Sequence, residues 1–294
     1  LIQAAGCHLQ ATVQRVKFMA VKKVLTVAGS DCSGGAGIQA DLKTFQERDV
    51  YGMSVLTVLV AMRPEDWGHV VTPVDIDIIR TQFRTILPGI GADAAKTGML
   101  PTVEIIDAVG AMLAEAGVRH LVIDPVMVCK GTSEPLFPEN TQAMIRSLLP
   151  IAEVVTPNSF EAAQLAGMAE LSTESEVEEA ARRIHALGAR NVVIKVARIF
   201  ADYTADVLFD GTAFTWLKEE RVQTTWTHGA GCSFSACIAA ELGKGATVAE
   251  AVRTAHEFVR AGLLGSFPLN KFVGPIYHKA LAKTRIIHRD EQRK

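Results

Sequence analysis

The stretch Val24-Leu25-Thr26-Val27-Ala28-Gly29 decides the fold class of this chain. It is a short, almost continuously apolar run, which is typical of a strand buried on both faces, and its glycine begins a turn. A helical pattern follows over residues 38–48, and a second apolar strand follows over residues 55–60. Strand, helix and strand in this order predict a parallel sheet whose two faces are covered by helices.

The same alternation continues along most of the chain. We expect further helices over residues 76–86, 103–116, 141–149 and 174–187, and further strands over residues 94–97, 121–123, 154–155 and 192–194. Beyond them, Asp210-Gly211 separates two short β-rich runs, which indicates a hairpin, and two helices close the pattern. The chain therefore reads as an α/β protein with a central, mostly parallel sheet, helices on both faces and a small β-hairpin.

Composition limits the classes of partner. The chain has 294 residues, 49% of them hydrophobic, and its 30 Lys and Arg nearly balance its 32 Asp and Glu. Because there is no basic stripe, and no apolar run of the roughly 18–20 residues that span a bilayer, we expect neither nucleic acid nor a membrane as partner. The 5 cysteines form no C-x-x-C pair, so neither a disulfide framework nor a zinc site is indicated, and a cytoplasmic location is expected.

The ends of the chain differ in pattern from its middle. Residues 1–18 show no clear periodicity, and Met19 precedes the first strand. We interpret 1–18 as an extraneous or disordered arm with Met19 as the natural start; a targeting arm is the alternative. Residues 19–285 are expected to form a single domain, and residues 286–294 a charged tail.

The turn Thr227-His228-Gly229-Ala230-Gly231-Cys232 opens an alanine-rich helix. A glycine-rich turn at a helix start directs backbone N–H groups and the positive end of the helix dipole at one spot, which suits a phosphate or a developing anion. Cys232 stands at this spot, where we expect a lowered thiol pKa and a role as nucleophile or base. The alternative is a plain helix cap with an inert buried cysteine.

Polar residues follow the predicted strands where parallel sheets bind ligands. The loop over residues 29–37 is rich in glycine and offers the carboxylate of Asp31 to a polar substrate group. Its spacing is neither that of a P-loop nor that of a dinucleotide-binding turn. The segments Lys96-Thr97-Gly98, Asp124-Pro125 and Thr156-Pro157-Asn158 end the next three strands.

Taken together, these motifs resemble one known family. The segments that carry the resemblance are 28–41, Lys96-Thr97-Gly98-Met99-Leu100, Asp124-Pro125-Val126-Met127, Thr156-Pro157-Asn158 with Glu161, and Gly229-Ala230-Gly231-Cys232. In this order they resemble the hydroxymethylpyrimidine/phosphomethylpyrimidine kinase family of the ribokinase-like superfamily, over about residues 20–280. The segments Phe267-Pro268-Leu269-Asn270 and Val273-Gly274-Pro275 are similar to its bacterial pyridoxine/pyridoxal kinase branch.

The resemblance implies a single ribokinase-like kinase domain and an ATP- and Mg²⁺-dependent reaction. The expected acceptor is the 5-hydroxymethyl group of a vitamin B6 vitamer: pyridoxal, pyridoxine or pyridoxamine. A monovalent cation such as K⁺ and a homodimer are further expectations. In the family a cysteine replaces the usual catalytic Asp, so Cys232 would take the hydroxyl proton or attack the pyridoxal aldehyde, beside the turn of Gly229, Ala230 and Gly231. Cys129, in a flap, would then serve as acid and base, or be a small lid residue.

The remaining site residues are assigned on the same resemblance. The substrate would contact Gly29, Asp31, Met62, Met99 and Val126. ATP would contact Asn158, Lys195, Thr227 and Gly231. Asp124 and Glu161 would hold the metal ion.

Two departures from the family pattern leave alternatives open. Met62 stands where pyrimidine kinases have a Gln, which favours vitamin B6, because a thioether packs on a ring but makes no polar pair. Val196-Ala197 stands where two glycines are expected near the ATP phosphates, which indicates a local frameshift or a weakened nucleotide site. The alternatives are therefore a hydroxymethylpyrimidine kinase of thiamine biosynthesis and a non-enzymatic vitamin-binding protein.

Overall fold

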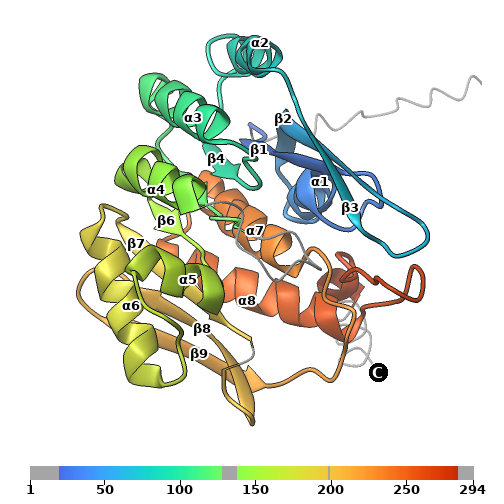
Figure 1. The fold of residues 1–294 in the computed structure, drawn as a ribbon, viewed down its shortest axis with the longest axis vertical. Coiled ribbons are helices and arrows are strands. Elements are labelled where there is room, and N and C mark those ends of the chain that lie inside the picture. The colour runs from blue at the N-terminus through green and yellow to red at the C-terminus, as the bar shows by residue number, and fades with distance from the viewer. Residues whose placement is uncertain (1–19, 128–137, 198, 284–294) are drawn as a thin grey trace, which may run out of the picture.

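A single nine-stranded sheet runs through the molecule in the order β3-β2-β1-β4-β5-β6-β7-β8-β9 (Figure 1). The computed structural model describes residues 20–127, 138–197 and 199–283. The strands are β1 Lys23–Asp31, β2 Tyr51–Met62, β3 His69–Pro73, β4 Ala94–Thr97, β5 Leu121–Ile123, β6 Val154–Val155, β7 Asn191–Val196, β8 Tyr203–Phe209 and β9 Phe214–Glu220. Cys129 and both ends of the chain lie outside the described residues.

The centre of the sheet is parallel, as predicted, and its two edges are antiparallel. Strands β2, β1, β4, β5, β6 and β7 all pair in parallel. The predicted hairpin is present as β8 and β9, but it continues the main sheet through antiparallel pairing of β7 with β8. At the other edge, β3 pairs antiparallel with β2. This strand was not predicted, because four of its five residues are exposed and so give no alternating pattern.

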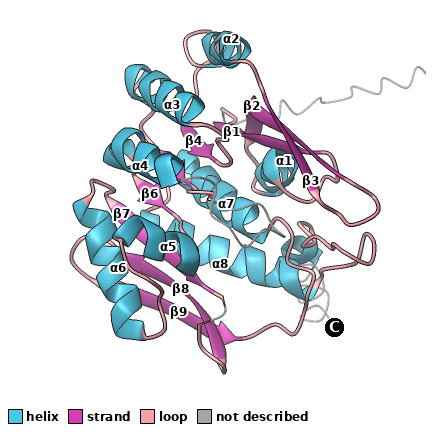
Figure 2. Cartoon of the chain, viewed as in Figure 1, coloured by secondary structure: helices cyan, strands magenta, loops and turns pink. Residues whose placement is uncertain are grey.

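Helices cover both faces of the sheet (Figure 2). On one face lie α1 Gly37–Glu47, α7 Ala230–Lys244 and α8 Val248–Leu264. On the other lie α2 Ile76–Ile86, α3 Val103–Ala116, α4 Pro138–Ser147, α5 Ser159–Ala166 and α6 Glu174–Ala186. Alternate residues of β1 supply the two cores: Val24 packs with Phe45 and Phe234 on the first face, and Leu25 and Val27 belong to the core on the second. The apolar run that predicted a two-sided sheet is therefore buried on both sides.

Most helix boundaries follow capping residues that the sequence displays. Thr102 accepts a hydrogen bond from the N–H of Ile105 and begins α3, and Gly117, with φ 59°, ends it. The predicted helix over 141–149 is wrong at its ends: α4 stops at Ser147, and Leu149–Ile151 forms a separate 3₁₀ turn around Pro150. The eight-residue α5 was missed because it is too short to show a period.

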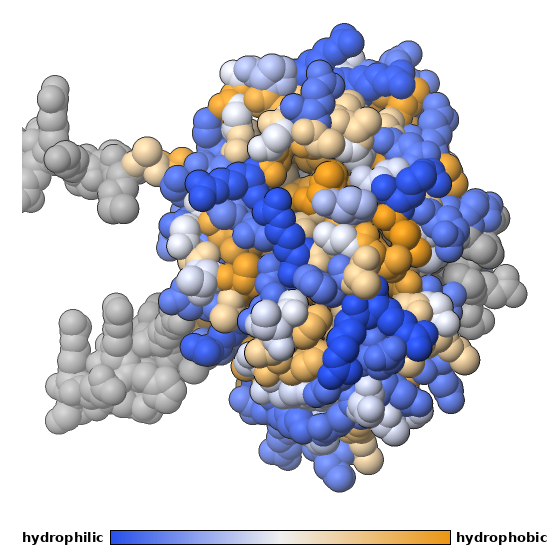
Figure 3. Space-filling model, turned by 90° about the vertical axis from the view of Figure 1, so that its left-hand side faces the viewer, coloured by the Kyte–Doolittle hydropathy of each residue, from blue (hydrophilic) through white to orange (hydrophobic). Residues whose placement is uncertain are grey.

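Hydrophilic residues dominate the face shown in Figure 3, and the apolar residues between them form separate patches. Within the ranges that the structure describes, no helix combines the length and the apolar character needed to cross a bilayer.

Candidate active site

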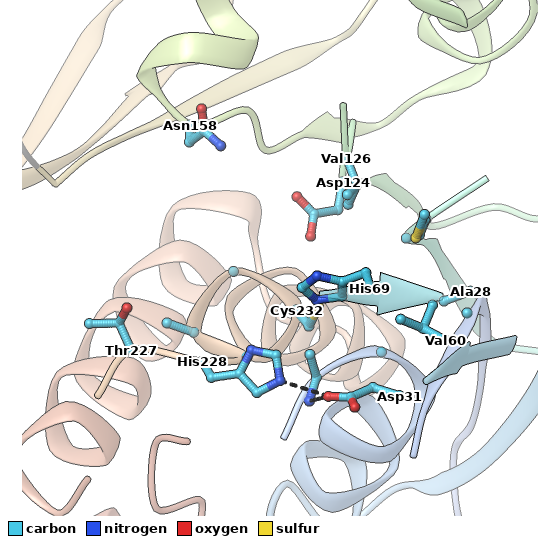
Figure 4. A pocket seen from close by; sticks show the side chains of 18 of the residues that line it. Ala28, Asp31, Val60, His69, Asp124, Val126, Asn158, Thr227, His228 and Cys232 are labelled. Atoms are coloured by element: carbon cyan, nitrogen blue, oxygen red, sulfur yellow. Dashed lines mark hydrogen bonds and ion pairs between the residues drawn. The ribbon is translucent and has the colours of Figure 1, made fainter. Parts of the chain in front are cut away.

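The carboxyl ends of the parallel strands open into a cavity of about 260 Å³ (Figure 4). Fourteen of the fifteen predicted site residues line it: Gly29, Asp31, Met62, Met99, Asp124, Val126, Asn158, Glu161, Lys195, Thr227, Gly229, Ala230, Gly231 and Cys232. The remaining one, Cys129, lies outside the described residues. Segments that are far apart in the sequence therefore converge where open α/β sheets bind ligands.

A second cavity of about 410 Å³ adjoins the first. The two share part of their lining, namely Asn158, Lys195, Thr227, Ala230 and Gly231. The second cavity extends toward β8 and α8 and includes Asp206, Arg221, His256 and Arg260. Two different molecules can therefore occupy the two cavities and meet at the glycine-rich turn.

The turn before α7 requires glycine for a specific reason. Gly229 has φ 78°, and a Cβ atom there would lie 1.8 Å from the carbonyl oxygen of Gly35. The loop over residues 29–37 and the turn over 227–232 thus touch backbone to backbone. Because α7 starts at Ala230, the N–H groups of Gly231 and Cys232 belong to the first turn, whose amides have no acceptor within the helix. They suit an anion at the wall that both cavities share.

The thiol of Cys232 lies at the start of two helices, because Cys232 is in the first turn of α7 and the N–H of Gly37, the first residue of α1, donates a hydrogen bond to the thiol. Burial nevertheless raises the pKa of this thiol to about 11, although the positive charge of Lys96 opposes the rise. The lowered pKa expected from the helix start alone is wrong. The loss of hydration outweighs the helix ends and the nearby ammonium.

The carboxylate of Asp31 fastens the two glycine-rich segments together. His228 Nε2 lies 2.7 Å from Asp31 Oδ2, and the same carboxylate accepts hydrogen bonds from the Ser33 N–H, the Ser33 hydroxyl and the Ala36 N–H at 2.8 to 2.9 Å (Figure 4). Burial alone would raise the pKa of Asp31, but the hydrogen bonds from His228 and Ser33 outweigh it and lower the pKa to about 2. Both oxygens of Asp31 thus accept hydrogen bonds within the protein, and because Asp31 also lines the first cavity, its expected contact with substrate stays a prediction.

Sequence reasoning missed His228 and His69. His228 is buried in the turn already quoted for its glycines, so its place directly before Gly229 was the available signal. His69 pairs with Met62 across the β2–β3 ribbon and lines the cavity, but its strand was not predicted. Burial lowers the pKa of His69, and the charge of His228 lowers it further.

A polar cluster stands at the wall between the two cavities. Lys195 Nζ lies 2.9 Å from Asp124 Oδ1, and Ser235 Oγ donates to Asp124 Oδ2 at 3.3 Å. Asn158 and Glu161 form a reciprocal capping box at the start of α5, with bonds of 2.8 and 2.9 Å. Burial raises the pKa of Glu161 to about 7, which Lys195 opposes and Asp124 reinforces.

The cluster suits a small divalent cation bound together with phosphate. Mg²⁺ commonly takes one or two protein carboxylates and completes its shell with waters and phosphate oxygens. Asp124 and Glu161 are two such carboxylates on one cavity wall. Among the described residues, no group of three or more His, Cys, Asp and Glu forms an all-protein metal cage. The donor set therefore fits a phosphate-assisted Mg²⁺ site.

Comparison with known proteins identifies the family. The family model described as phosphomethylpyrimidine kinase matches residues 31–277. The chain belongs to this family. The Bacillus subtilis (strain 168) pyridoxine kinase is 56% identical over 265 residues, which cover 90% of this chain and 98% of that protein. The hydroxymethylpyrimidine/phosphomethylpyrimidine kinase of the same organism is 36% identical over 269 residues, covering 91% and 98%.

A solved structure has the same fold. The structure of the Staphylococcus aureus pyridoxal kinase in complex with AMP-PCP and pyridoxal matches with a TM-score of 0.85 and 45% identity, and covers 90% of this chain and 96% of that one. The predicted ribokinase-like α/β fold is confirmed.

The departure at Val196-Ala197 from the expected family pattern causes no backbone strain. Val196 ends β7 with its side chain buried in the core, and Ala197 lines the second cavity. In the described part of the chain only Asp49 and Trp67 combine a side chain with a positive φ. Neither Val196 nor Ala197 therefore occupies a conformation that demands glycine.

Proposed function

We propose that the chain is an ATP-dependent kinase that phosphorylates the hydroxymethyl group of vitamin B6 vitamers. The main observation in support of this function is that two cavities meet at the glycine-rich turn over residues 227–232, which also contains Cys232. The 56% identity to a pyridoxine kinase over nearly the full length of that protein supports the same activity. The chain is thus a phosphotransferase with an alcohol group as acceptor.

The first cavity suits the vitamin. Met62, Met99 and Val126 supply apolar surface for a flat ring, and Cys232 lines the same cavity. We infer that the hydroxymethyl group points toward Cys232. The second cavity then holds ATP, whose terminal phosphate reaches the shared wall at Lys195 and Gly231.

Different groups of the protein stabilise the transferring phosphoryl group and accept the hydroxyl proton at that wall. The N–H groups at the start of α7 and the ammonium of Lys195 face the charge that spreads over the transferring phosphoryl group. Cys232 receives the hydroxyl proton. Because the transition state of phosphoryl transfer is loose, the proton moves late, and a thiolate that is seldom populated at rest still suffices as its acceptor.

Mg²⁺ would be held by Asp124 and Glu161, with Asn158 fixing the carboxylate of Glu161 through the capping box. When bound, the ion neutralises phosphate charge and orients the phosphoryl group. A dependence on K⁺ remains a proposal from the family resemblance alone. The homodimer and the role of Cys129 as a second thiol over the vitamin are proposals on the same basis. The proposal of a cytoplasmic location is based on the pattern of the cysteines.

The ranking of substrates is a second proposal. Met62 offers no hydrogen bond to an aminopyrimidine edge, so we expect a B6 vitamer to be preferred over hydroxymethylpyrimidine. The 36% identity to a hydroxymethylpyrimidine/phosphomethylpyrimidine kinase keeps that compound as a candidate second substrate of the same cavity.

A coupled assay of ADP release with pyridoxal, pyridoxine and hydroxymethylpyrimidine side by side tests both proposals. Cys232→Ala should lower kcat by at least about 10²-fold, the common worth of a positioned acid–base group. Cys237→Ala is the matched control, since Cys237 lies in the same helix but faces the core. Near-normal turnover of the Cys232 variant would refute the assignment of the base, and no turnover of any vitamer by the wild type would refute the kinase.

A further inference from the structure

A fully buried ion pair lies behind the cavity and has no part in the mechanism above. Lys96 Nζ stands 3.1 and 3.2 Å from the two carboxylate oxygens of Asp41, and the Thr26 hydroxyl donates to Asp41 at 2.6 Å. All three side chains are completely shielded from solvent. Removing two charges from water costs several kcal/mol each, and an apolar pair of similar size is often as stable or more stable. A contribution to the stability of the fold is therefore a weak explanation for the presence of this buried ion pair.

The position of the pair connects it to the reacting thiol. Lys96 is on β4, two residues before Gly98, which lines the first cavity. A Cβ atom on Gly98 would lie 3.1 Å from Lys96 Nζ, so the ammonium is directly beneath the cavity surface. Asp41 is on α1, one turn beyond Gly37, whose N–H bonds to the thiol of Cys232. The ammonium, held by Asp41, thus lies close to the cavity surface at Gly98 and one helical turn from the residue that bonds to the thiol.

We propose that Lys96 is a positioning residue for the kinase reaction: its ammonium, fixed by Asp41, stabilises the thiolate that Cys232 becomes when it takes the hydroxyl proton. The inference rests on the proposed function, because it assumes that Cys232 is the base. The proton passes from the substrate hydroxyl to the sulfur, and the substrate oxygen forms its bond to the terminal phosphorus of ATP as the bond from that phosphorus to ADP breaks and ADP leaves. Lys96 keeps its own proton throughout.

The surrounding charges fix the direction of the effect. The groups that act on the thiol are Lys96 on β4, Asp41 on α1, Asp124 after β5 and Lys195 on β7. Of these, Lys96 is the strongest influence that lowers the pKa of Cys232, whereas Asp41 and Asp124 raise it. The charge of Lys96 is secure, because negative neighbours led by Asp41 raise its pKa even though burial alone would lower it. The two members of one ion pair should therefore shift the thiol in opposite directions.

Alkylation of Cys232 by iodoacetamide tests this without any turnover. The rate is followed against pH by mass spectrometry of the peptide that contains Cys232, because only the thiolate reacts. Lys96→Met should slow the reaction near pH 8 by about tenfold, which corresponds to one pKa unit. Lys43→Met is the control, because Lys43 is also on α1 but bonds to the exposed loop at Gly34.

Folding and function are checked separately. Lys96→Met leaves Asp41 buried without its counterion, so the double variant Lys96→Met with Asp41→Leu keeps the test valid if the single variant unfolds. It should fold, as judged by its thermal transition, and react more slowly than the wild type. Equal rates in the wild type and in the folded Lys96 variants would overturn the role of Lys96. An active Cys232→Ala variant would instead refute the base and leave the electrostatic result standing.

Discussion

Replacement of Asp31 by Asn removes the charge that joins the two glycine-rich segments. The carboxylate accepts four hydrogen bonds, from the Ser33 N–H and hydroxyl, the Ala36 N–H and His228. An amide has a single acceptor oxygen, so its NH₂ group must face at least one of these donors. We expect the variant to lose both stability and the close contact between the loop and the turn.

The size of the effect follows from the pKa of Asp31. The pKa falls from 3.8 to about 2 on folding, a difference of about 1.8 units, which at 1.36 kcal/mol per unit is about 2 kcal/mol of stability. Because the folded pKa is the lower one, this contribution is present above the unfolded pKa of 3.8 and is lost as the pH falls through about 2. The deficit of Asp31→Asn should therefore be largest at neutral pH and shrink as acid protonates the wild type.

Urea unfolding of the wild type and Asp31→Asn at a series of pH values measures the deficit. Asp66→Asn is the matched control, because the pKa of Asp66 is also about 2 but its ion pair with Arg63 is exposed, and such pairs add little stability. A deficit that stays constant from neutral pH down to about pH 3, or an equal deficit in the Asp66 variant, would refute the reasoning.

Three further predictions follow from the cavity walls. Met62→Gln should shift the ratio of kcat/KM toward hydroxymethylpyrimidine by about 1–2 kcal/mol if one hydrogen bond is gained, and an unchanged ratio would contradict the role of Met62. Gly229→Ala should abolish turnover and lower Tm, because the new Cβ atom would clash with the carbonyl oxygen of Gly35. Gly231→Ala should fold normally, since its Cβ atom would lie at an ordinary contact distance of 3.4 Å from Lys195 Nζ. Calorimetric titration of the Gly231→Ala variant with an ATP analogue should show weaker binding. Val196→Gly should destabilise the protein by about 2–4 kcal/mol in urea unfolding without tightening the analogue, because it empties a buried site and relieves no positive φ.

The sequence allowed the centre of the fold to be predicted because that part is regular. Strand β1 is an unbroken apolar run, and α3 carries a Thr cap and a closing Gly, so periodicity and capping chemistry agreed. Strand β3 was not predicted from the sequence, because the residues of β3 that pair with β2 are mainly exposed. Its register comes from the partner strand, which a local pattern does not reveal.

The candidate site likewise has features that the sequence predicted and features that it did not predict. Glycine-rich turns and residues at strand ends were visible as motifs, and the structure places them around one cavity. The contact between Asp31 and His228 spans 197 positions and was invisible, as was the ion pair of Lys96 and Asp41. The pKa of Cys232 was predicted in the wrong direction because helix position is local information, whereas burial depends on the whole fold.

The location of α7 at the middle of the sheet governs the order in which this protein can assemble. Its residues Phe234 and Ile238 cover the face of β1 and β4, although about two hundred positions separate α7 from β1. A growing chain that has completed β1 to β9 still exposes apolar residues of the sheet, such as Ala94 and Val122, on the face that α7 covers. The apolar side is covered, and the thiol placed, only when the last quarter of the chain docks. Shortened chains that stop before α7 should therefore collect as aggregates rather than as weakly active kinase.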